Sequence, residues 1–106
     1  MTPHPLAVLG DPVRRALLDH LAAGEQTAGA LAAAARAQFG IGGPAVSQHL
    51  AVLKAGGFAT SRPRGRERVY RLSPEGFSAA QAWLDRYRGF WSAALGRLGD
   101  DLDRED

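Results

Sequence analysis

The sequence predicts one mainly α-helical domain that carries a single small β-hairpin. Three observations lead to this prediction: several long segments have apolar residues at helical spacing, one arginine-rich segment has strand-forming residues beside a central glycine, and 106 residues leave room for only one core. We expect this domain to occupy residues 1–98. An acidic tail at residues 99–106 is expected to be disordered.

The N-terminal segment predicts a short helical turn followed by a longer helix. Leu6 and Leu9 can form one turn before a glycine interrupts it. Asp11 has the side chain of a helix N-cap, and Pro12 suits the first helical position, where its missing N–H is not needed. The apolar residues that recur at four-residue steps before Gly24 ends this helix are Val13, Leu17 and Leu21.

Two helices joined by a glycine-rich turn are predicted next. Thr27 can cap an alanine-rich helix that runs to about Phe39. Gly40 and Gly42 then flank Ile41, which we expect to anchor the turn in the core. A second helix is predicted at residues 42–55, so that this part of the chain has the order helix, turn, helix.

The helix expected at residues 42–55 has two different faces. Val46, Leu50 and Leu53 form an apolar stripe that packs on a core. The other face has short or polar side chains, which can approach a DNA major groove closely, pair with base edges and meet phosphate. A solvated helix face fits this segment equally well, so its neighbours must decide. The residues expected to contact DNA are Pro44, Ala45, Ser47, Gln48, His49 and Lys54.

His49 has an alternative interpretation. It stands at the flank of the apolar stripe, where a packed histidine bonded to backbone is as reasonable as a contact with phosphate.

Residues 59–72 predict a strongly basic β-hairpin. Gly65 lies at the expected turn, and Val69 and Tyr70 are good strand residues. Residues 62–71 contain five arginines and one glutamate, a net charge of +4. These arginines could merely protect an edge strand from aggregation, but their number exceeds that need and favours binding to DNA phosphates or a minor groove. The residues expected to do so are Arg62, Arg64, Arg66 and Arg68.

A long C-terminal helix is predicted at residues 74–98. Ser73 can cap it, and Pro74 suits its first position. Its apolar stripe is wider than one small domain can bury, which predicts a homodimer interface. The alternative is that the helix folds back over its own domain. The expected interface residues are Leu6, Leu9, Trp83, Leu84, Tyr87, Trp91 and Leu95.

The residue inventory argues against other classes of function. There is no cysteine, and the three histidines fall on different predicted elements, so we expect no metal site and no cofactor. No nucleophile motif or phosphate-binding glycine loop is present, so we do not expect an enzyme. No apolar run approaches the roughly 20 residues of a membrane span, and we expect a soluble cytoplasmic protein.

Taken in order, the segments DPVRRALLDHLAAGE, PAVSQHLAVLKAGGFA and RPRGRERVYRLSPEG resemble the ArsR/SmtB group of bacterial winged-helix repressors over nearly the whole chain. The resemblance implies a winged helix-turn-helix domain with N- and C-terminal dimerisation helices. It also implies a homodimer that binds an inverted-repeat operator in double-stranded DNA, with Ser47 and Gln48 in the segment that enters the major groove. Repression relieved by an effector is implied as well.

The chain departs from this group in two ways. It lacks the cysteines, and the histidine in the last helix, that the group's metal sensors use, so an unknown non-metal small-molecule effector, or none, is expected. The segment before residue 42 is also a few residues longer than in the group. The leading expectation is a transcriptional repressor, and the alternative is a winged-helix module for protein contact without specific DNA binding.

Overall fold

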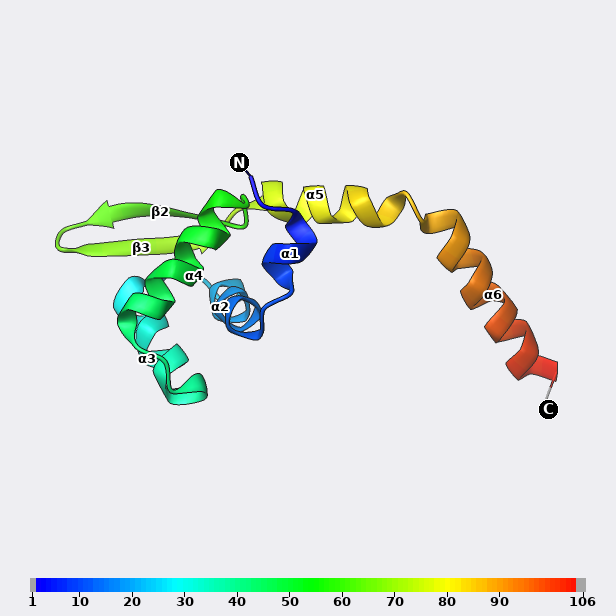
Figure 1. Ribbon diagram of the computed structural model, residues 1–106, viewed down its shortest axis with the longest axis horizontal. Coiled ribbons are helices and arrows are strands. Elements are labelled where there is room, and N and C mark those ends of the chain that lie inside the picture. Colours follow the sequence, from blue (N-terminus) through cyan, green and yellow to red (C-terminus); the bar gives the residue numbers. More distant parts are fainter. Residues whose placement is uncertain (1, 105–106) are drawn as a thin grey trace.

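The computed structural model describes residues 2–104, which form helices around a small antiparallel sheet (Figure 1). The predicted fold class, mainly α-helix with a β-hairpin, is confirmed. The elements in chain order are α1 (Pro5–Leu9), α2 (Pro12–Ala22), β1 (Gln26–Thr27), α3 (Ala28–Phe39), α4 (Gly43–Ala55), β2 (Ala59–Arg64), β3 (Glu67–Leu72), α5 (Pro74–Asp85) and α6 (Arg88–Arg104).

Most of the helices begin where their N-cap residues predict. The Asp11 carboxylate accepts two backbone N–H groups in the first turn of α2, at 2.8 and 3.1 Å. The Thr27 hydroxyl accepts the N–H three residues later, at 3.1 Å, and starts α3. Ser73 stands at the N-cap of α5 as predicted, but its hydroxyl bonds to the Glu75 carboxylate instead of to a backbone N–H.

The core lies between α2, α3, α4 and the base of the hairpin. Phe58, directly after α4, is fully buried as predicted. Ile41 is partly buried and packs against the core, which anchors the turn between α3 and α4 as expected. The largest fully buried side chains are Phe58, Leu17, Leu31, Leu53, Val8, Val46 and Val69.

The sheet has one strand more than the sequence predicts. The two residues of β1 pair antiparallel with β3, with Gln26 opposite Tyr70 and Thr27 opposite Val69. Strand β3 therefore lies between β1 and β2 and has a partner on each side. A two-residue strand has no detectable apolar alternation, which is why the sequence did not reveal it. Its consequence is that the base of the hairpin is attached to the junction of α2 and α3.

The single C-terminal helix predicted at residues 74–98 is wrong. The chain forms two helices, α5 and α6, separated by a turn at Arg86 and Tyr87. The N–H groups of these two residues bond to carbonyls three residues earlier, at 3.2 and 3.0 Å, which tightens the end of α5. The apolar spacing continues through this turn and therefore gave no sign of it. Helix α6 also extends to Arg104, so residues 99–104 are helical instead of disordered; residues 105–106 lie outside the described part of the chain.

Helix α6 projects away from the rest of the molecule (Figure 1). The described chain is accordingly elongated, with extents of 61 × 30 × 22 Å. The large apolar residues exposed from the end of α5 onward are Leu84, Tyr87, Phe90, Trp91, Leu95, Leu98 and Leu102. Among residues 2–104, none of the helices combines the length and apolarity needed to cross a lipid bilayer.

The contact between Phe58 and the start of α5 gives a test of the fold. A Cβ atom on Gly76 would lie 2.6 Å from the Phe58 ring and 2.8 Å from the carbonyl oxygen of Gly56. We expect Gly76→Ala to lower the free energy of unfolding by about 1–3 kcal/mol, measured by urea denaturation, because this core is overpacked by one methyl group. Gly89→Ala is the control, since no atom lies within 4 Å of its added Cβ. Equal stability of both variants would contradict the close packing at Gly76.

Candidate nucleic-acid interface

The polar face of α4 is open to solvent. Val46, Leu50 and Leu53 are at most 2% exposed and hold the helix on the core. On the other side, Ser47 and Gln48 are exposed, with no part of the described chain covering them. The exposed residues of this face are Pro44, Ser47, Gln48, Ala51 and Lys54, whereas Ala45 is half-buried. The structure therefore presents most of the predicted contact residues together on one helix surface.

The turn before α4 is short. Helix α3 takes up the chain as far as Phe39, and Gly40 ends it in the left-handed region at φ 69°, where glycine is favoured. Its N–H bonds to the carbonyl of Arg36 at 2.9 Å. Gly42 is the N-cap of α4 and supplies no side-chain acceptor for the first N–H groups of that helix. The long connecting segment is thus mostly helix, followed by three residues of turn.

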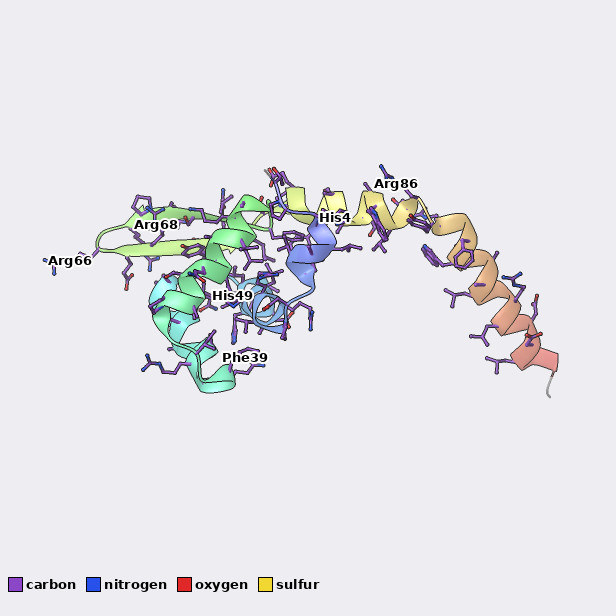
Figure 2. The ribbon with its side chains drawn as sticks, viewed as in Figure 1. His4, Phe39, His49, Arg66, Arg68 and Arg86 are labelled. Atoms are coloured by element: carbon purple, nitrogen blue, oxygen red, sulfur yellow. The ribbon has the colours of Figure 1, made fainter. Side chains whose placement is uncertain are left out.

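The tip of the hairpin is basic, but its arginines differ in their contacts. Arg66 extends from the tip, away from the body of the protein (Figure 2), and forms no ion pair or side-chain hydrogen bond with the described residues. Arg68 donates to the Ser61 hydroxyl at 3.1 Å, and Arg71 donates to the Thr60 hydroxyl at 3.2 Å. Hydroxyl partners leave the guanidinium charge uncompensated, so both residues still contribute positive potential.

Two of the predicted DNA contacts are already paired with carboxylates. Arg62 lies 2.5 Å from the carboxylate of Glu25, in the loop after α2, and both side chains are about half exposed, at 49% and 47%. The hydrogen bond from Arg62 is the main cause that lowers the pKa of Glu25, and the same bond raises the pKa of Arg62. Arg64 lies 3.4 Å from Glu67. Glu25 was missed because it is 37 residues from its partner, and no local pattern joins them.

His49 lies at the edge of the exposed face. Its ring points towards α2, away from the outer surface of α4 (Figure 2), and its side chain is 22% exposed. Nδ1 of the ring lies 3.4 Å from Nη1 of Arg14 and 3.8 Å from Oδ1 of Asp11. Its neighbours are therefore two side chains of the neighbouring helix and its cap, a third environment beyond the backbone or phosphate partners considered from the sequence.

The residues predicted for a dimer interface fall into two groups. Leu84, Tyr87, Trp91 and Leu95 are between 41% and 59% exposed and form an open apolar surface on α5 and α6. The others are at least partly occupied within the chain. Trp83 is half-buried and packs against the rings of His4 and Tyr87, Leu6 is half-buried, and Leu9 packs on the core of its own chain. Leu9 is thus a contact within the subunit.

The charged and imidazole side chains do not gather into a metal-binding group. The three histidines stand at the N-cap of α1, in α2 and in α4. Within the part of the chain that the structure describes, no three histidine, aspartate or glutamate side chains converge as metal ligands would.

Known proteins share both the sequence and this arrangement. Residues 9–62 match the model of a helix-turn-helix domain family. The chain is 41% identical over 97 residues to the HTH-type transcriptional regulator Rv2034 of Mycobacterium tuberculosis, covering 92% of this chain and 84% of that protein. The crystal structure of a possible transcriptional regulator for arsenical resistance has a TM-score of 0.73 and 41% identity, covering 93% of this chain and 96% of that one.

A solution structure extends the comparison to an assembled protein. The homodimeric winged helix-turn-helix DNA-binding domain Mb0332 of Mycobacterium bovis, a possible ArsR-family transcriptional regulator, has a TM-score of 0.61 and 26% identity, covering 81% of this chain and 78% of that one. With α3 and α4 as its helix-turn-helix and the β2–β3 hairpin as its wing, the chain belongs to the ArsR family of winged helix-turn-helix transcriptional regulators.

Proposed function

We propose that the protein is a repressor that binds an inverted-repeat operator in the cytoplasm as a homodimer, acting by binding DNA and not by catalysis. The observation that carries this proposal is the exposed polar face of α4 beside an arginine-rich hairpin. An α-helix fits the major groove only if its outer side chains are short enough to let it approach, and those of α4 are. Membership of a family of transcriptional regulators supports the same function.

In this proposal α4 reads base edges. Gln48 is exposed at the middle of the helix and can form two hydrogen bonds with adenine, while Ser47 can pair with several base edges. Pro44 and Ala45, in the first turn, can contact a thymine methyl group. Lys54, in the last turn, can bind a phosphate. His49 faces α2, so we propose that it supports the helix instead of contacting DNA.

The hairpin would contribute mainly charge. Arg66 and Arg68 have no carboxylate partner in the described chain and are the strongest candidates for phosphate contacts. Arg64 can exchange its exposed partner for a phosphate, because a surface ion pair of this kind contributes little stability. Arg62 adds less, since Glu25 neutralises its charge at close range.

The dimer follows from the apolar surface on α5 and α6. Trp91 and Leu95 are 41% and 59% exposed, and each large apolar side chain that is buried contributes about 1.5–3 kcal/mol. The same helix of a second copy offers a matching surface around a two-fold axis. The homodimeric state of the Mb0332 domain supports this arrangement. The chain has no cysteine, so any small-molecule effector would be recognised without thiolate ligands.

Fluorescence anisotropy with two DNA duplexes tests the proposed function. One duplex would be taken from the region upstream of the protein's own gene, and the other would be a scrambled duplex of the same composition. Specific binding predicts tighter binding to the first, with affinity for both falling steeply as salt rises. If both duplexes bind equally, sequence-specific repression is wrong. If neither binds, the basic surface would serve contact with an acidic protein.

Gln48→Ala tests base reading by α4. We expect affinity for the specific duplex to fall by about 1–3 kcal/mol, because two hydrogen bonds to a base are lost, while affinity for the scrambled duplex stays the same. Gln81→Ala is the matched control, since Gln81 is exposed on α5 and bonds only to Asp85. Equal losses of Gln48→Ala on both duplexes would remove Gln48 from base reading.

Arg66→Ala tests the role of the hairpin. We expect both duplexes to bind more weakly, and the slope of log affinity against log salt to flatten by about 0.9, the value for one phosphate contact. The control replaces both Arg62 and Glu25 by glutamine, which removes an ion pair and leaves the net charge unchanged. A slope that changes more in the control than in Arg66→Ala would contradict this assignment.

Trp91→Glu tests the dimer surface. A buried carboxylate without a partner is costly, so we expect this variant to sediment as a monomer and to lose affinity for the inverted repeat. Ser92→Glu adds the same charge at the neighbouring exposed position of α6 and should remain dimeric. A dimeric Trp91→Glu protein would place the interface elsewhere.

A further inference from the structure

One arginine side chain joins three helices at the inner edge of α4. Arg14 belongs to α2, and its Nε donates to the carbonyl of Val8 at 2.7 Å while its Nη2 donates to the carbonyl of Ala7 at 3.0 Å. Both carbonyls lie at the C-terminal end of α1, where they lack partners within that helix. Nη1 of the same guanidinium lies 3.4 Å from Nδ1 of His49 on α4. All three guanidinium nitrogens are thus engaged inside the subunit.

The position of Arg14 is itself held by the cap of α2. Its backbone N–H donates to the Asp11 carboxylate at 3.1 Å, and that carboxylate also lies 3.8 Å from His49. Burial, the largest single effect, raises the pKa of Asp11, but the N–H groups of Arg14 and Val13 and the nearby His49 and Arg14 together lower it below its usual value. The carboxylate therefore stays ionised and anchors both the guanidinium and the imidazole.

Helix α1 connects this cluster to the opposite side of the subunit. It has only five residues, too few to be stable alone, and its place depends on its neighbours. One neighbour is α5, against which α1 packs. The ring of His4, which caps α1, meets the ring of Trp83 on α5 edge-on with centroids 5.9 Å apart. Helix α1 thus lies between α5 and the guanidinium that reaches α4.

We propose that Arg14 is a positioning residue for DNA recognition, which sets the orientation of α4 relative to α1 and α5. A dimer reads two half-sites about one helical turn apart, so the angle between each α4 and the dimer surface decides whether both helices fit their grooves together. Arg14 fixes this angle through His49. The inference rests on the proposed DNA binding and assigns to Arg14 a role without direct DNA contact.

The adjacent residue provides a matched control. Arg15 donates to the carbonyl of Leu9 at 2.8 Å, also at the end of α1, but it has no bond to α4. Arg14→Lys and Arg15→Lys both keep the positive charge and lose the planar guanidinium that can serve several acceptors at once. The two variants therefore differ in the link to His49, with net charge held constant.

The experiment measures the affinity of each full-length variant for the specific and the scrambled duplex over a range of salt concentrations. For Arg14→Lys we expect a loss of about tenfold or more on the specific duplex, the size of one lost base contact, with unchanged scrambled-duplex affinity and salt slope. Arg15→Lys should keep the wild-type ratio of the two affinities. Sedimentation should show dimers for both variants.

A double-mutant comparison separates positioning from general destabilisation. His49→Ala cuts the link at its α4 end and leaves the α1 contacts of Arg14 intact, so it should cause the same specific loss even if Arg14→Lys folds poorly. In the His49→Ala background, Arg14→Lys should have no further effect on the ratio of the two affinities. A purely structural role would instead add its effect in both backgrounds, and that result would overturn the proposal.

Three other outcomes are decisive. Equal losses on both duplexes with a flatter salt slope would mean that Arg14 binds phosphate directly, and an unchanged ratio in Arg14→Lys would mean that the link is idle; either result overturns the proposal. Amide hydrogen exchange without DNA should be faster in α4 of Arg14→Lys than of Arg15→Lys, and equal rates would also count against it. Failure of the wild-type protein to distinguish the duplexes would instead reject the proposed function.

Discussion

The angle between the recognition helix and the hairpin depends on the burial of Phe58. Its N–H bonds to the carbonyl of Leu53 in α4 and its carbonyl accepts the N–H of Ser73 before α5, both at 2.9 Å. Its ring is fully buried and meets that of Phe77 edge-on, with centroids 4.9 Å apart. Gly76 leaves room for that ring. Helix α4, strand β2 and helix α5 therefore diverge from one packed side chain, which holds the exposed face of α4 and the hairpin in one orientation.

Around this centre the polar groups divide into those that hold the subunit together and those that remain available to a partner. Arg14 and His49 use their nitrogens within the subunit, and Arg62 is neutralised by Glu25. Arg66, at the hairpin tip, faces solvent. The basic surface offered to DNA is therefore smaller than the number of arginines in the hairpin suggests. The apolar residues show the same division, since the core encloses those of α2 to α4 whereas those of α6 stay exposed.

The sequence by itself determined the features that depend on neighbours along the chain. Asp11 and Thr27 mark the starts of α2 and α3 because a cap acts on N–H groups two or three residues away. The apolar stripe of α4 was predictable because helical geometry places residues three and four apart on one side. The hairpin turn at Gly65 adopts a φ of 61°, a conformation that glycine favours and that its neighbours announced.

Tertiary structure decided what depends on residues distant along the chain or on a backbone turn that leaves the apolar pattern intact. Glu25 meets Arg62, and β1 meets β3, only because the α2–α3 junction packs beside the hairpin. The turn at Arg86 and Tyr87 separates α5 from α6 although the apolar spacing runs through it. Periodicity reports which side of a local segment is apolar, because side-chain direction repeats with the helix. It carries no information on which distant group arrives at the other side, since that depends on how the segments pack.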